Sequence, residues 1–498
     1  MIPNITHPLP SYICYTASNF SVRNALLSLV AGCIVRLVLC RWWASYGSKT
    51  QIDPNVPGPS TLQCLWANIQ EVTRHALGDK HVAWSAQFGN SYQYRTLLGQ
   101  NRIETSDLKA VAFVLGYELT LAEDTDHKRQ QRILGPFLTR PESLANLLPI
   151  CYDTAQQMRD MMRDSAGPIN IDDFTGRCTM DIIRAFGDLT MTTQSVSFRA
   201  AIWRLLPRWF GKTLKPTKVS FWQTNATMNK LSKELLAERT HALEPADGSD
   251  HFEDLLASCM KANKRLKPGD KDRLTDKELL NQVTKFMLSG SDTIATTITW
   301  SLYHLAQYSD IQQRLRQECL SLNDERPSLN AIDALPFLEA VVHEILRLIP
   351  PVRAVSRGAA DDISVPLAEP IKGRDGNMIY ELDVAKGTSF FIHRPSSRDY
   401  AVKTAVDRIN TSEQIWGPDA KAFNPARHLN SSSSGDRPAD DSNVHGRWGN
   451  ILTFLGGARS CIGYRLALLE IKAILFVLIL DLEFAELADM PHIEMAAG

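Results

Sequence analysis

The sequence predicts a mainly helical protein with a small β region, built as a single large domain behind an N-terminal membrane anchor. Apolar residues recur with helical period over most of the long segments, whereas the strand signals are short. One strand signal surrounds Asp375-Gly376, which predicts a hairpin. The anchor is predicted by an apolar stretch near the N-terminus. The helical segments are 140–200, 225–262, 276–322, 330–348 and 463–480, and a further strand is expected near Tyr92–Leu98.

The composition indicates a globular protein and excludes some functional classes. Of the 498 residues, 44% are apolar, which is enough for a substantial core. The net charge of −1 argues against a nucleic-acid partner or a polyanionic substrate. The nine cysteines include no Cys-x-x-Cys pair, and their odd number does not suggest a disulfide framework. We therefore expect the main domain to face a reducing compartment such as the cytosol.

The apolar stretch Ala25–Tyr46 is long enough to cross a bilayer, and its C-terminal end carries aromatic residues suited to the membrane interface. Arg36 near its middle costs about 2.5–3.5 kcal/mol on insertion scales. A helix lying flat on the membrane therefore remains an alternative to a span. Positive charge is concentrated on the C-terminal side of the stretch, which predicts that the following domain faces the cytosol.

These signals divide the chain into four parts. Residues 1–24 form a short tail and residues 25–46 the anchor helix. Residues 47–60 form a linker whose prolines prevent the helix from continuing. Residues 61–498 form the main domain.

The segment from Phe454 to Gly463 places Cys461 in a glycine-rich loop, with Arg459 two residues before it and a predicted helix directly after. Backbone N–H groups at a helix N-terminus stabilise a thiolate, which is the form that binds metal. A buried structural cysteine is the alternative. The pattern Phe-x-x-Gly-x-Arg-x-Cys-x-Gly resembles the haem-binding signature of the cytochrome P-450 family. On this resemblance we expect Phe454, Gly456, Arg459, Cys461 and Gly463 to bind the cofactor.

The resemblance implies a cytochrome P-450 fold with haem b, whose iron takes Cys461 as its axial ligand. Electron donation from the thiolate favours cleavage of the O–O bond. It further implies an NADPH- and O2-dependent monooxygenase that inserts one oxygen atom into a small lipophilic substrate. The expected partners are NADPH-cytochrome P-450 reductase and membrane lipid, and the expected location is the endoplasmic reticulum membrane, with a single pass and the catalytic domain in the cytosol.

The predicted helix Asn281–Gln307 contains the unusual sequence Ser289-Gly290-Ser291-Asp292-Thr293. Glycine inside a helix costs about 1 kcal/mol relative to alanine. Such local violations are expected at functional sites. The segment resembles the oxygen-activating motif of the family, in which Asp292 and Thr293 would deliver protons to bound dioxygen. The alternative is a bent polar helix in which the Thr293 hydroxyl bonds its own backbone.

Glu344 and Arg347 are three residues apart and so share one face of a predicted helix. Together with Arg427 they resemble the family's structural triad, a buried charge network behind the haem that takes no part in the chemistry. His428 stands where the family usually has an aromatic residue.

Several cations are candidates for the haem propionates. His127 fits the family pattern, but the fourth residue after it is Gln131, and an arginine follows only at Arg132. Arg357, on a predicted strand, and Arg459 are the other candidates. Solvated surface arginines are the alternative for each.

Residues 202–222 mix aromatic side chains with cations and contain no acid, which suits an anionic bilayer surface. Ordinary packing of the aromatic residues is the alternative. The predicted hairpin over Glu369–Thr388 and the sequence Trp416-Gly417-Pro418-Asp419 resemble fungal members of the family. On that analogy the leading substrate class is a terpenoid or another secondary metabolite, followed by a fatty acid or a foreign aromatic compound.

Two departures from the family motivate a second hypothesis. Residues 394–408 read as an insertion, and the C-terminal hairpin usual in the family is not evident after Cys461. We expect Val477–Phe484 to lead from a helix into a strand without a partner, which would leave backbone groups unsatisfied. A catalytically impaired or non-catalytic member of the fold is therefore the alternative to an active enzyme. A hydrolase has no supporting Gly-x-Ser-x-Gly or His-Glu-x-x-His motif.

Overall fold

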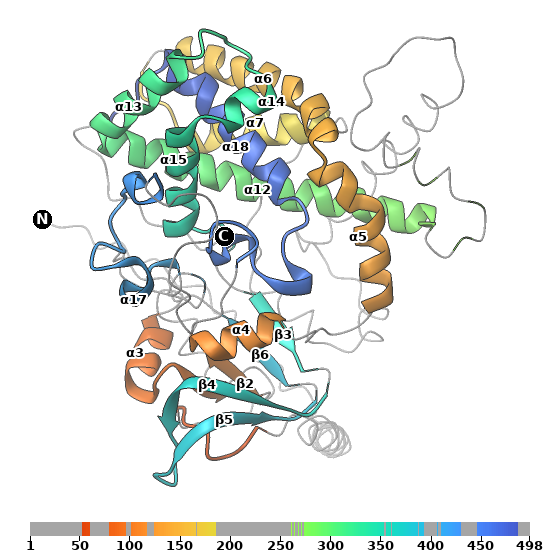
Figure 1. Ribbon diagram of the computed structural model, residues 1–498, viewed down its shortest axis with the longest axis vertical. Helices are drawn as coiled ribbons and strands as arrows, with labels where there is room; N and C mark the ends of the chain where they lie inside the picture. Colours follow the sequence, from red (N-terminus) through yellow and green to blue (C-terminus); the bar gives the residue numbers. More distant parts are fainter. Residues whose placement is uncertain are drawn as a thin grey trace, which may run out of the picture.

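The computed structural model describes residues 52–59, 79–95, 101–116, 124–165, 167–185, 273–352, 355–359, 361–386, 388–392, 410–429 and 446–486, with single positions between them. Within these ranges most helices gather at one end of the molecule, and the strands lie at the other end together with α3 (Asp79–Phe88) and α4 (Leu108–Gly116) (Figure 1). The mainly helical prediction with a small β region is confirmed. The anchor at 25–46, the basic aromatic segment 202–222, most of the predicted helix 225–262 and most of the segment 394–408 lie outside the described residues.

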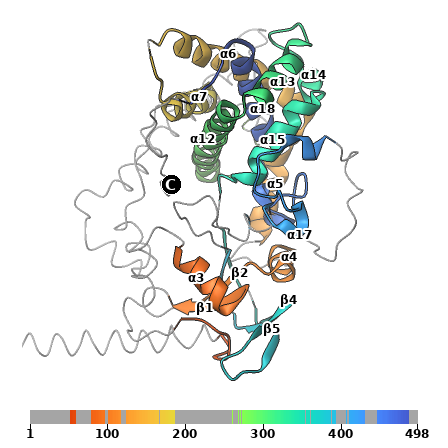
Figure 2. The same cartoon turned by 90° about the vertical axis from the view of Figure 1, so that its left-hand side faces the viewer.

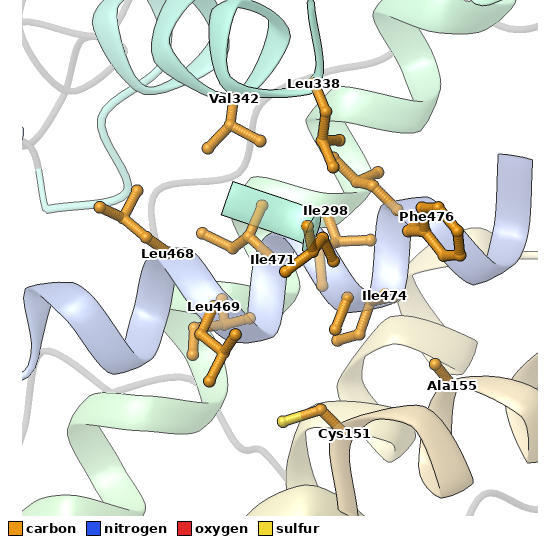
Figure 3. Close-up of a cluster of buried hydrophobic side chains, with 14 of the residues drawn as sticks. Cys151, Ala155, Ile298, Leu338, Val342, Leu468, Leu469, Ile471, Ile474 and Phe476 are labelled. Carbon is orange, nitrogen blue, oxygen red and sulfur yellow. The ribbon is translucent and has the colours of Figure 1, made fainter. Parts of the chain in front are cut away.

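The helical part is built around α18, which follows the cysteine loop. Side chains of α18 meet those of three other helices in the core, among them Ile298, Leu338 and Cys151 (Figure 3). Burial of this apolar surface is the main stabilising contribution to such a core. The helices are α5 (Asp124–Thr139), α6 (Pro141–Arg163), α7 (Ile171–Ala185), α12 (Asp276–Gln307), α13 (Ser309–Leu320), α14 (Leu329–Asp333), α15 (Pro336–Leu348), α17 (Glu413–Trp416) and α18 (Tyr464–Asp481).

Three of the predicted long helical segments are interrupted. The segment 140–200 breaks after Arg163, where α6 ends, and α7 begins only at Ile171. The segment 276–322 breaks at Tyr308, whose backbone dihedrals (φ −117°, ψ 76°) are not helical, so that α12 and α13 are separate helices. The segment 330–348 breaks before Pro336, which begins α15 because a proline at the first helical position needs no N–H partner. The spacing of apolar residues predicted the buried faces of these helices correctly, but it gives no signal for such short breaks.

The strands form two sheets at the opposite end from α13 (Figures 1 and 2). The first sheet has the order β1-β2-β6-β3, in which β2 and β6 are parallel and the other pairs antiparallel. The second is the predicted hairpin, β4–β5, and Gly376 in its turn has a φ of 92°, which favours glycine. The elements are α3 (Asp79–Phe88), β1 (Ser91–Arg95), β2 (Asn101–Thr105), α4 (Leu108–Gly116), β3 (Val355–Gly358), β4 (Ile363–Lys372), β5 (Met378–Val384) and β6 (Ser389–Ile392).

Among the helices of the described ranges, none is both long enough and apolar enough to cross a membrane. The predicted anchor at 25–46 is not among them, and it stays a prediction.

The prediction of a strand after α18 is wrong. Residues 482–486 follow the end of α18 without regular structure. The backbone groups of Phe484 are nevertheless satisfied, because the side-chain amide of Gln312 accepts from its N–H at 2.9 Å and donates to its carbonyl at 2.9 Å. Arg316 donates to the carbonyls of Ile479 and Leu482, at 2.8 and 2.5 Å. Side chains of α13 therefore make the hydrogen bonds to this backbone that a partner strand would have made.

Candidate active site: the cysteine loop

The cysteine loop is a compact turn held by its own backbone. Two short 3-10 helices, η3 (Leu452–Phe454) and η4 (Gly457–Arg459), precede Cys461. The N–H of Cys461 donates to the carbonyl of Phe454 at 2.9 Å, which closes the loop. Gly463 is the N-cap of α18, so the sulfur lies beside the positive end of a helix dipole.

Cys461 differs from the other cysteines of the described part. Cys151, Cys178 and Cys319 are buried, whereas Cys461 is exposed. Surrounding protein nevertheless removes part of the hydration of Cys461, and this desolvation raises the pKa of its thiol. The backbone N–H of Gly463 donates to the sulfur and lowers the same pKa, but by less. A cationic metal centre would supply the charge that favours the thiolate. The sulfur is thus reachable for an incoming ligand, as the buried three are not.

The glycines of the loop have distinct roles. Gly457, the fixed fourth position of the signature, has a φ of 68°, which glycine adopts without steric cost. Gly456, expected at the cofactor, is buried with extended backbone. Leu455 has an unusual backbone conformation, because its dihedrals (φ 58°, ψ −172°) lie in a region that is essentially restricted to glycine. Its carbonyl accepts from the Arg447 N–H at 2.8 Å, which holds this conformation.

Helix α5 lies against the loop through Gln131 rather than Arg132. The Gln131 side chain donates from Nε2 to the Ala458 carbonyl at 3.2 Å, while the Arg132 side chain is exposed. A Cβ on Gly135, one turn further along, would lie 3.9 Å from Ile462, so this face of α5 packs closely on the loop. The His127 side chain lies outside the described side chains. The position of each residue around α5 therefore brings the Gln131 amide to the loop, where the family pattern has an arginine.

Two other predicted cations lie near each other. Arg357 on β3 is partly buried, and burial lowers the pKa of its guanidinium. The positive charge of Arg459 lowers the same pKa further, because the two groups repel. An anionic group placed between them would relieve that repulsion. The arrangement brings one cation from the sheet and one from the cysteine loop to a common place.

The polar segment of α12 contains both predicted proton-delivery residues. Asp292 reaches solvent, yet partial desolvation raises the pKa of its carboxyl, and the negative charge of Asp172 raises it further. The Thr293 hydroxyl donates to the Ser289 carbonyl at 2.6 Å. The sequence analysis gave this bond to the helix backbone as the alternative to a role in proton delivery. It leaves the Thr293 oxygen as an acceptor.

The start of α12 is fixed by a capping box. The Thr275 hydroxyl accepts from the Glu278 N–H at 3.3 Å, and the Glu278 carboxylate accepts from the Thr275 N–H at 2.8 Å. Arg129 of α5 pairs with the same carboxylate. One residue pair therefore links the helix that contacts the cysteine loop to the helix that contains Asp292.

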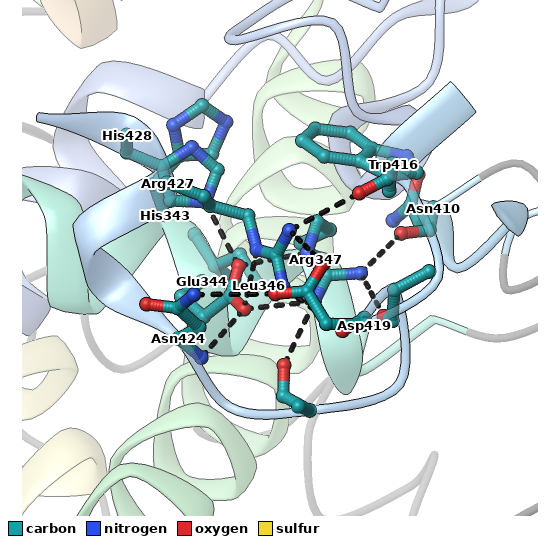
Figure 4. A network of polar contacts seen from close by, with 12 residues as sticks. His343, Glu344, Leu346, Arg347, Asn410, Trp416, Asp419, Asn424, Arg427 and His428 are labelled. Atoms are coloured by element: carbon teal, nitrogen blue, oxygen red, sulfur yellow. Dashed lines mark hydrogen bonds and ion pairs between the residues drawn. The ribbon is translucent and has the colours of Figure 1, made fainter. Parts of the chain in front are cut away.

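Glu344 is the centre of a buried charge network (Figure 4). Its carboxylate accepts from Arg347 at 2.7 and 2.8 Å and from Arg427 at 3.0 Å. Burial alone would raise the pKa of Glu344, but hydrogen bonds from Arg347 and His428 outweigh it and lower the pKa to about 2. The three residues predicted for the structural triad are therefore in contact.

The sequence did not predict every member of this network, and His428 and Asn410 are among those it missed. His428 lies 2.8 Å from the Glu344 carboxylate and stacks on His343 with ring centroids 4.0 Å apart. Asn410 accepts from Arg347 through its carbonyl at 2.7 Å, and its side-chain oxygen accepts from the Leu452 N–H at 2.8 Å. Asn410 thereby connects the network to the start of the cysteine loop. No local motif marks Asn410, because its role depends on three-dimensional contact, whereas His428 directly follows Arg427 of the predicted triad.

The residues present fit a haem better than a bare metal ion. In the described part, no group of three or more His, Cys, Asp or Glu side chains could hold a metal. One accessible cysteine at a helix N-terminus suits a metal whose other ligands come with the cofactor, and the paired Arg357 and Arg459 suit carboxylate groups of that cofactor. Cys461 would bind the iron, and the two arginines would bind the propionates.

A helical domain with an accessible cysteine in this loop defines the haem-thiolate class of protein. The family model for cytochrome P450 matches residues 96–368 and 397–496. The chain belongs to the cytochrome P450 family of monooxygenases, which are haem-thiolate oxidoreductases.

The similar proteins are fungal. Cytochrome P450 monooxygenase 205 of Postia placenta is 30% identical over 494 residues, which cover 88% of this chain and 87% of that protein. A ganoderic acid synthetase of Ganoderma lucidum is 25% identical over 515 residues, covering 90% of each chain. Cytochrome P450 monooxygenase claP of Ampulloclitocybe clavipes is 27% identical over 457 residues, covering 82% of this chain and 81% of that protein.

Proposed function

We propose that this protein is an NADPH-dependent monooxygenase that receives its electrons from a cytochrome P450 reductase and oxidises a lipophilic secondary metabolite. The observation that carries the proposal is the accessible Cys461 at the N-terminus of α18, in a complete haem-binding signature. A haem bound there supplies the activation of dioxygen. The protein supplies the thiolate, the charge network that holds the loop, and the proton path.

The contacts in α12 suggest how protons are handled. The Thr293 hydroxyl gives its own proton to the Ser289 carbonyl, so its oxygen can accept a hydrogen bond and orient a proton donor. Asp292, whose pKa is raised, holds a proton closer to neutral pH than an ordinary aspartate. We assign Asp292 to proton transfer and Thr293 to positioning the donor.

The substrate class is inferred from the relatives. One of them is named for ganoderic acid synthesis, which supports a secondary metabolite, and a terpenoid remains our leading class. Kinship at the level of fold does not fix a substrate. A panel of terpenoids and fatty acids, screened for displacement of the haem Soret band, separates these classes. A shift with fatty acids alone would contradict the terpenoid assignment.

We further propose attachment to the endoplasmic reticulum membrane through residues 25–46, with the catalytic domain in the cytosol. The apolar character of that stretch and the charge distribution around it support this location.

The Thr293→Val variant tests the proposed proton path. We expect normal haem content and an unchanged thiolate spectrum, but a several-fold rise in NADPH consumed per product formed, because oxygen is then reduced without reaching the substrate. Thr297→Val is the matched control, since the Thr297 hydroxyl makes the same kind of backbone bond one turn later, to the Thr293 carbonyl at 2.8 Å. An unchanged ratio in Thr293→Val would contradict the role assigned to Thr293.

A further inference from the structure

Leu455, six residues before Cys461, has a backbone conformation that its own side chain disfavours. Its φ is 58° and its ψ is −172°. The other non-glycine residues with positive φ in the described part are Asn323 and Asn450. Asparagine adopts positive φ more readily than leucine, because its short polar side chain can bond the nearby backbone. Contacts around Leu455 must therefore hold a conformation that is unfavourable for the residue by itself.

Backbone hydrogen bonds hold Leu455 from both sides. Its N–H donates to the Leu452 carbonyl at 2.8 Å, and its carbonyl accepts from the Arg447 N–H at 2.8 Å. The preceding carbonyl, that of Phe454, accepts from the Cys461 N–H at 2.9 Å. An ordinary negative φ at Leu455 would turn these peptide groups away from one another, and the bonds need that alignment. The unusual conformation is thus a condition for closing the loop on Cys461.

The side chains of Phe454 and Leu455 enter two different hydrophobic clusters. Phe454 is buried in the helical core around α18, and its ring meets those of Trp448 and Tyr464 edge-on, with centroids 6.1 Å apart in each pair. Leu455 is partly buried and packs against a second cluster, here called the sheet-side cluster. The buried residues of the sheet-side cluster come from β2, α4, β4 and β5 and include Leu452 of the loop itself. The chain therefore passes from one core to the other between two consecutive residues.

We propose that Leu455 is a positioning residue that anchors the cysteine loop to the sheet-side cluster and so fixes the place of the Cys461 sulfur. The proposal rests on Cys461 as the haem ligand. Val355 of β3, two residues before Arg357, packs against the same cluster. Helix α4 contributes to that cluster and contacts η4, which ends at Arg459. One anchor therefore holds the thiolate in a fixed relation to both arginines expected at the propionates.

The variants Leu455→Ala and Leu455→Gly test whether the backbone is strained. Both remove the packing of the side chain, but only glycine adopts this φ without steric cost. We expect the haem-bound Leu455→Gly protein to unfold at a higher urea concentration than Leu455→Ala. Leu482 is the matched control, because it is also partly buried but has an ordinary φ of −112°. There the alanine variant should be the more stable one. The same order at both positions would refute the strain at Leu455.

Two further measurements test the anchor itself. We expect Leu455→Gly and Leu455→Ala to transfer haem to excess apomyoglobin several-fold faster than the wild type. We also expect them to lose part of the thiolate Soret band of the reduced, carbon monoxide-bound protein. Leu455→Met, which restores the apolar volume, should retain both properties, and so should Leu482→Ala, which lies outside the loop.

The result that overturns the proposal differs from the one that overturns the haem ligand. Wild-type haem transfer and a full thiolate band in Leu455→Gly would refute the anchor and leave Cys461 as the ligand. A wild-type protein that binds haem without a thiolate band would refute both.

Discussion

Glu470 is a fully enclosed acid on α18, nine residues after Cys461. Within the described part its Oε2 has no hydrogen-bond partner, and burial raises the pKa of the carboxyl to about 8. The folded protein therefore keeps Glu470 neutral at pH values where the unfolded chain has already lost the proton. Glu470 therefore makes the stability of the fold sensitive to pH.

The sign of that sensitivity follows from the raised pKa. Below about pH 4.5 both states are protonated and Glu470 has no effect on stability. As pH rises toward 8, ionisation favours the unfolded chain, and the free energy of unfolding falls by an amount on the order of 3–5 kcal/mol. We predict that Glu470→Gln unfolds at higher urea concentration than the wild type at pH 8, and that the difference shrinks toward pH 5. Glu325→Gln, at an exposed position, is the control. Parallel pH profiles for wild type and Glu470→Gln would contradict the assignment.

At the scale of the element, Gln312 and Arg316 of α13 hold residues 482–486, and Gln312 makes both bonds to Phe484. Gln312 is buried and donates to the Leu305 carbonyl at 2.8 Å in addition to its two bonds with Phe484. Replacing it with leucine would leave three buried backbone groups without partners. An unsatisfied buried group costs roughly 1–3 kcal/mol.

We therefore predict that Gln312→Leu lowers the free energy of unfolding by about 2–4 kcal/mol. Gln313→Leu is the matched control, because the next residue of the same helix is exposed and should change stability little. Urea unfolding of the two variants measures the difference. If both variants unfold at the same urea concentration, the hydrogen bonds of the Gln312 amide to Phe484 do not stabilise the fold.

Elements differed in how well the sequence predicted them. The Asp375-Gly376 hairpin and the long helix with Ser289–Thr293 follow from local patterns, and the structure has both. The irregular segment after α18 does not, because it depends on contacts with α13. The break at Tyr308 does not either, because one non-helical residue leaves the apolar pattern of the two helices intact. Helix phase explains the substitution of Gln131 for the expected Arg132 at the loop, since one residue turns a side chain by about 100° around a helix.

At the scale of the whole molecule, hydrogen bonds join the cysteine loop to other parts of the described domain. Gln131 reaches it from α5, and Asn410 connects it to the Glu344–Arg347 pair of α15. The positive charge of Arg459 in the loop also repels that of Arg357 on β3. The signature around Cys461 was predictable because its residues are consecutive. Asn410 was not, because only the folded chain brings it to Arg347 and to the loop.

The central claim is that Cys461 is the haem ligand of this protein. The absorption spectrum of the reduced, carbon monoxide-bound full-length protein tests it most directly, with Cys461→His and Cys319→Ser compared with the wild type. We predict that the wild type and Cys319→Ser show the red-shifted Soret band of thiolate-ligated haem, and that Cys461→His loses this band even where it still binds haem. A thiolate spectrum retained in Cys461→His would contradict the account.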